Sequence, residues 1–76
     1  MDKSFAYNLK LARLRCGFTQ QDMSDRLNIN RTTYTKWETA KSEPSIENIK
    51  MLVKILEISY DYLFSEANRK DGEKLF

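Results

Sequence analysis

The chain has 76 residues and a mass of 9.0 kDa, which allows one small domain. Hydrophobic residues make up 41% and charged residues 32%, with two glycines and one proline, so a collagen-like or turn-rich all-β protein is excluded. The single Cys16 cannot form an internal disulfide, which indicates a reducing, cytoplasmic compartment. Histidine is absent, which excludes a four-ligand zinc site and Ser–His or Cys–His nucleophilic catalysis. No apolar run is long enough for a membrane span, and without a glycine-rich phosphate loop we expect no cofactor.

The charge of the chain is unevenly distributed. Residues 1–41 contain eight Lys or Arg and four Asp or Glu side chains, so their net charge is 8 − 4 = +4. Residues 42–76 contain five Lys or Arg and seven Asp or Glu side chains, so their net charge is 5 − 7 = −2. A basic first half favours contact with a polyanion. A chance split on a small surface is the alternative that charge alone leaves open.

Apolar residues recur at helical spacing along most of the sequence, which predicts an all-α fold with five short helices. The first helix is expected to end at Cys16-Gly17, the second to span 19–27 and the third 31–38. A fourth is expected after Ser45 and a short fifth after Ser59. The expected core residues are Phe5, Leu9, Ala12, Met23, Leu27, Tyr34, Trp37, Ile46, Ile49, Leu52, Val53, Leu56 and Leu63.

Polar residues predict where the first three helices begin and end. Ser4 is a candidate N-cap for the first helix. Thr19 and Asp22 have capping-box spacing for the second. In the turn that follows, Asn28 can accept a left-handed backbone and Asn30 can cap the third helix. Two short helices joined by a three-residue turn are typical of a helix-turn-helix.

A helical wheel of residues 31–38 separates two kinds of side chain. The outward side is polar and consists of Arg31, Thr32, Thr35 and Lys36. The opposite side holds Tyr34 and Trp37, which we expect to pack in the core rather than to stack on bases. Arg, Lys and Thr can all contact base edges in the major groove, so the third helix is a candidate for reading DNA. The alternative is an ordinary solvated helix face.

Three segments of the sequence carry a resemblance to a known family. They are Phe18-Thr19-Gln20 with Met23-Ser24 and Leu27, residues 37–45 (WETAKSEPS), and residues 52–63. With them, the chain resembles the Cro/cI-type helix-turn-helix (XRE) family over residues 5–64. The resemblance implies a compact five-helix, lambda-repressor-like DNA-binding domain of a bacterial or phage-encoded regulator. We place this domain at 1–65 and a polar tail, frayed or weakly helical, at 66–76. Asn28 and Ala40 stand where the family usually has Gly, and Ser24 where it usually has Ala.

The resemblance also implies roles for individual residues. The expected base-reading side chains are Arg31, Thr32, Thr35 and Lys36. The expected phosphate contacts are Gln20, Thr39 and Lys41, which set register rather than sequence preference. Arg13 and Glu38 match a family pair that bridges the first and third helices, with two independent surface charges as the alternative.

The leading hypothesis is a sequence-specific regulator of transcription that binds double-stranded DNA and represses by occupancy. One such small domain contacts too few base pairs to mark a single genomic site, so we expect a homodimer on a palindromic operator. The expected dimer surface is Ile58, Tyr60, Tyr62 and Phe64, although Leu63 and Phe64 could instead cap the monomer core. An antitoxin whose tail binds a toxin is the alternative function. Neither an enzyme nor an RNA-binding protein has support in the residues present.

Overall fold

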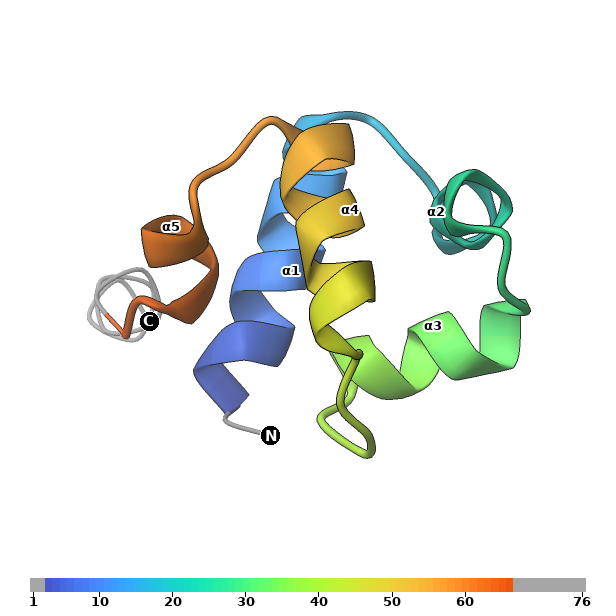
Figure 1. The fold of residues 1–76 in the computed structure, drawn as a ribbon, viewed down its shortest axis with the longest axis horizontal. Coiled ribbons are helices and arrows are strands. Elements are labelled where there is room, and N and C mark those ends of the chain that lie inside the picture. The colour runs from blue at the N-terminus through green and yellow to red at the C-terminus, as the bar shows by residue number, and fades with distance from the viewer. Residues whose placement is uncertain (1–2, 67–76) are drawn as a thin grey trace.

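The structure is a computed structural model that describes residues 3–66, and within them five α-helices follow one another (Figure 1). Their bounds are α1 Lys3–Arg15, α2 Gln20–Leu27, α3 Arg31–Glu38, α4 Ile46–Leu56 and α5 Tyr60–Phe64. The expected all-α class and order of helices are confirmed. The expected polar tail lies, apart from Glu66, outside the described residues. None of the helices within residues 3–66 is long and apolar enough to cross a membrane.

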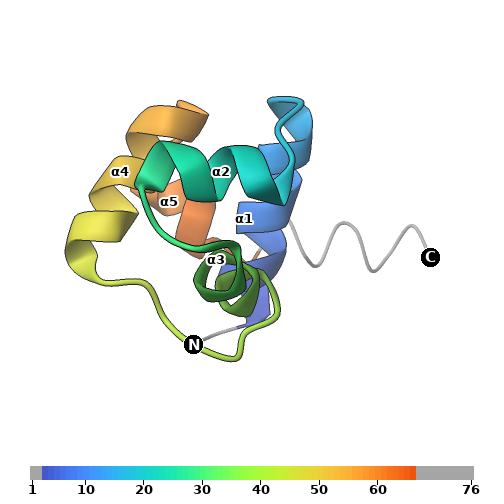
Figure 2. The same ribbon diagram turned by 90° about the vertical axis from the view of Figure 1, so that its right-hand side faces the viewer.

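The helices pack around one small core. Helix α1 packs against α3 and α5, and α2 packs against α3 and α4. In Figure 2, α2 spans the side of the molecule from α4 to α1, with α3 beneath it. The core side chains are Phe5, Leu9, Ala12, Met23, Leu27, Tyr34, Trp37, Leu52, Leu56 and Leu63, all expected from the sequence.

The prediction is wrong for one core residue, Ile46. Ile46 is 71% exposed, because it is the first residue of α4 and precedes the part of the helix that faces the core. Ile49 and Val53, farther along the same stripe, are partly buried against the core. The helical period of the stripe is therefore correct, but its first member lies in solvent.

Side-chain caps begin the helices that form the helix-turn-helix. The predicted capping box is confirmed: Thr19 Oγ1 accepts from the Asp22 N–H at 3.0 Å, and the Thr19 N–H donates to Asp22 Oδ2 at 2.8 Å. That backbone donor lowers the pKa of Asp22 below its usual value. Asn30 caps α3 as expected, accepting from the Thr33 N–H at 2.8 Å. Ser4 is not the cap of α1, because the helix already includes Lys3 and buries Ser4.

Three residues other than glycine have a left-handed backbone, and they lie just after the ends of α2, α3 and α4. Asn28 has φ 56°, as its tolerance for this conformation predicts. Ala40 has φ 60° just after α3, and Glu57 has φ 54° just after α4. A left-handed residue other than glycine or asparagine costs about 1–2 kcal/mol. Ala40 and Glu57 are therefore sites of local backbone strain.

Replacing Ala40 with glycine is expected to stabilise the fold. The Ala40→Gly change removes the steric conflict of Cβ at positive φ, so the free energy of unfolding should rise by about 1 kcal/mol in urea denaturation followed by circular dichroism. The matched control is Ala6→Gly inside α1, where the same change should lower stability by about 1 kcal/mol or more. Equal losses in the two variants would show that residue 40 is not strained.

Candidate nucleic-acid interface

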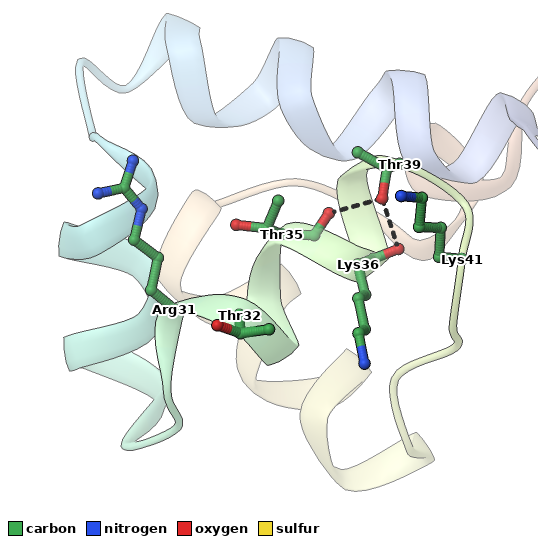
Figure 3. Close-up of a pocket in the computed structure, with 6 residues that line it drawn as sticks. All are labelled: Arg31, Thr32, Thr35, Lys36, Thr39 and Lys41. Atoms are coloured by element: carbon green, nitrogen blue, oxygen red, sulfur yellow. Dashed lines mark hydrogen bonds between the residues drawn. The ribbon is translucent and has the colours of Figure 1, made fainter.

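Six side chains line one open hollow of about 350 Å³ along α3 and the loop after it. They are Arg31, Thr32, Thr35, Lys36, Thr39 and Lys41 (Figure 3). The first four share one face because they follow each other at helical spacing. Three of the six are cations and none is acidic, so the hollow is positively charged.

The opposite face of α3 anchors the helix. Tyr34 and Trp37 are both buried, and their rings meet edge to face with centroids 5.8 Å apart. Because the aromatic side is fixed in the core, the polar side must face solvent. Neither ring is accessible to a nucleic-acid base in this structure.

Two of the six side chains that line the hollow already have partners within the protein. The Thr39 hydroxyl donates to the carbonyl oxygens of Thr35 and Lys36, at 3.0 and 3.4 Å, and so closes the end of α3 (Figure 3). The Thr35 hydroxyl donates to Gln20 Oε1 at 3.2 Å. Arg31 and Thr32, in contrast, are exposed side chains at the start of the helix.

Gln20 does not line the hollow and instead joins α2 to α3. It accepts from Thr35, and its Nε2 donates to Glu38 Oε1 at 3.2 Å. Sequence reasoning treated Gln20 as a phosphate contact only and missed this bridge. Its position at the first residue of α2 still places it beside the free N–H groups of that helix end.

The Glu38 carboxylate is the centre of a buried network. Arg13 donates to it through Nε at 2.7 Å and Nη2 at 3.1 Å, and both side chains are almost fully buried. The Tyr34 hydroxyl and Gln20 are two further donors to the same carboxylate. Arg13 Nη1 also donates to the Phe18 carbonyl oxygen at 2.8 Å. The network therefore ties α1, α2 and α3 to the Glu38 carboxylate, and Arg13 also connects it to the loop between α1 and α2.

The network also shifts the proton affinities of its members. The hydrogen-bonded Glu38 carboxylate raises the pKa of Arg13. Burial, followed by the hydrogen bond to Glu38, raises the pKa of Tyr34. Both groups therefore keep their protons, and their donor roles, at neutral pH.

The four residues expected at a dimer surface differ in exposure. Ile58 and Tyr62 pack against the core and are partly buried, and the Tyr62 hydroxyl accepts from Arg15 Nη1 at 3.1 Å. Tyr60 is 50% exposed and Phe64 47%, although the Phe64 ring also lies 5.2 Å from that of Phe5. The free apolar surface of α5 is therefore narrower than the sequence suggested.

Asn8 fixes α5 to α1, a role that the sequence analysis missed. Its Nδ2 donates to the carbonyl oxygens of Leu63 and Ser65, at 3.0 and 2.7 Å, and the residue is fully buried. A polar residue on the apolar side of α1 was the available signal.

Within residues 3–66, no cluster of Asp, Glu, Cys or His side chains could hold a metal ion.

Comparison with known proteins identifies similar sequences. A family model described as helix-turn-helix matches residues 9–63. The chain is 40% identical over 67 residues to YqaE, an uncharacterized HTH-type transcriptional regulator of Bacillus subtilis, covering 87% of this chain and 58% of the relative. It is 36% identical over 61 residues to the HTH-type transcriptional activator BcrR of Enterococcus faecalis, covering 78% of this chain and 30% of the relative.

A third relative is the cryptic phage CTXphi transcriptional repressor RstR of Vibrio cholerae. It is 40% identical over 57 residues, which cover 75% of this chain and 51% of the relative. The chain therefore spans 30–58% of the length of these three relatives. No solved structure matches the chain.

Removing the carboxylate of Glu38 is expected to destabilise the domain strongly. In Glu38→Ala the buried Arg13 charge loses its partner, and such a loss costs about 3–5 kcal/mol of unfolding free energy. The measurement is chemical denaturation, with Glu47→Ala as the control because Glu47 is a solvent-exposed carboxylate on α4. A loss no larger than that of the control would show that the network does not hold the helices together.

Proposed function

The chain belongs to the XRE-type helix-turn-helix family, and from this premise we propose that it is a transcriptional regulator that binds double-stranded DNA with α3 in the major groove. The observation that carries the proposal is the hollow along α3, lined by Arg31, Lys36 and Lys41 and by no acidic side chain. A positive, exposed helix face held by a buried aromatic face fits a groove lined by phosphates and base edges.

The side chains of the hollow have three different roles in this proposal. Arg31 and Lys36 donate to guanine O6 and N7, while Thr32 contacts a base edge or a thymine methyl group. Thr35 supports them from within the protein, since its hydroxyl is bonded to Gln20. Lys41, Thr39 and the α2 end at Gln20 face the phosphates on the walls of the groove and set the register.

We propose repression by occupancy, because a domain seated in the major groove obstructs other proteins at that site. The relative RstR is named a repressor and BcrR an activator, so both signs of regulation occur among the relatives. The antitoxin alternative depended on the tail, which lies almost wholly outside the described residues, and no observation favours it.

We further propose a homodimer on a palindromic operator, with α5 at the dimer surface. Tyr60 and Phe64 are the exposed apolar side chains of α5 that support this choice. A two-fold dimer doubles the number of base pairs read and requires half-sites about 10–10.5 bp apart.

Arg31 and Lys41 are expected to respond differently to substitution. On a consensus duplex selected from a random pool, Arg31→Ala should cost about 1–3 kcal/mol of binding free energy and relax the preference at one base pair. Lys41→Ala should weaken consensus and random duplexes alike and lower the salt slope by about one for each bound protomer. Fluorescence anisotropy at several salt concentrations measures both effects. Equal losses for Arg31→Ala on the two duplexes would contradict a base contact.

The dimer surface is tested by placing a charge on α5. Tyr60→Glu should reduce affinity for the full operator and leave affinity for a single half-site nearly unchanged, as measured by gel shift. The matched control is Met51→Glu, which changes a similarly exposed apolar residue on α4 and should leave both affinities intact. Tight binding of one wild-type molecule to an asymmetric site would refute the dimer.

A further inference from the structure

A second hollow adjoins the first at the end of α3. It measures about 360 Å³ and is lined by Lys3, Ala6, Tyr7 and Lys10 from α1 and by Glu38, Thr39 and Ala40 from the end of α3 and the turn after it. Thr39 lines both hollows, so the two form one continuous surface. The α1 side chains in the second hollow have no role in the function proposed above.

The second hollow is positively charged. All the charged side chains of α1 are cations: Lys3, Lys10, Arg13 and Arg15. Glu38 is the one acidic residue among those that line the hollow, and its carboxylate is neutralised by the buried Arg13. The charges of Lys3 and Lys10, both exposed, are therefore not cancelled there.

The spacing of the two lysines matches an extended anion better than a compact one. Lys3 and Lys10 are seven residues apart on one face of α1, which corresponds to about 10 Å along the helix axis. At this spacing, each of the two lysine ammonium groups can contact a different phosphate of one DNA strand. Tyr7 lies between them on the same face and can add a phenolic donor.

We propose that this hollow is a second site for the DNA backbone, in which Lys3 and Lys10 bind phosphates that flank the stretch contacted by the loop at Lys41. The inference rests on the proposed function, because the hollow continues from the reading surface across Thr39. The contacts are to phosphates alone, so they raise affinity and fix orientation without reading sequence.

The test is the salt dependence of binding to the selected consensus duplex and to a scrambled duplex. Each phosphate contact contributes about 0.9 to the slope of log affinity against log salt, so the double variant Lys3→Ala/Lys10→Ala should lower the slope by about 1.8 for each bound protomer on both duplexes. For each bound protomer, the affinity deficit should then be roughly tenfold larger at 50 mM than at 200 mM salt. The matched control is Lys50→Ala/Lys54→Ala, which removes two exposed lysines from α4 and should leave the slope unchanged.

A scan of neutral methylphosphonates along the consensus duplex locates the contacts. Neutralising one or more flanking phosphates should lower the affinity of the wild-type protein for the duplex. The same substitution should leave the affinity of the Lys3→Ala/Lys10→Ala variant unchanged. An unchanged slope in this variant, with wild-type protein still bound to the consensus, would overturn the second site and leave the proposed function intact. Failure of the wild-type protein to bind any duplex DNA would overturn both.

Discussion

The arrangement of the helix-turn-helix depends on one buried carboxylate. Glu38 accepts hydrogen bonds from Arg13 on α1, from Gln20 on α2 and from Tyr34 on α3. A buried charge is tolerated only when its charge and its lone pairs are satisfied, so each donor must occupy its own position. In a domain with so thin a core, this requirement fixes the orientation of the three helices more specifically than apolar packing alone can.

The same network connects the core to the surface that we propose reads DNA. Gln20 donates to Glu38 and accepts from Thr35, and Thr35 lines the hollow along α3. The side chain that sequence reasoning assigned to a phosphate therefore also holds α3 against α2. Preorganisation of this kind lowers the entropy lost on binding, because α3 is already fixed before it meets the groove.

The sequence predicts the periodic and capped parts of the fold but not the shared contacts. Helical spacing and the caps at Thr19 and Asn30 correctly predict the order of the helices and most of the core. Ile46 fails because periodicity does not say where along a helix burial begins. The roles of Asn8 and Gln20 also escape prediction, because their partners lie 55 and 18 residues away in the chain.

The central claim is that the exposed face of α3 reads bases, and a change of specificity tests it most directly. Lysine pairs with guanine and glutamine with adenine in the major groove. Selection from a random duplex pool with wild-type protein and with Lys36→Gln should therefore give two consensus sequences that differ at one base pair of each half-site, from guanine to adenine. Identical consensus sequences, or none with either protein, would contradict the assignment of α3 as the reading helix.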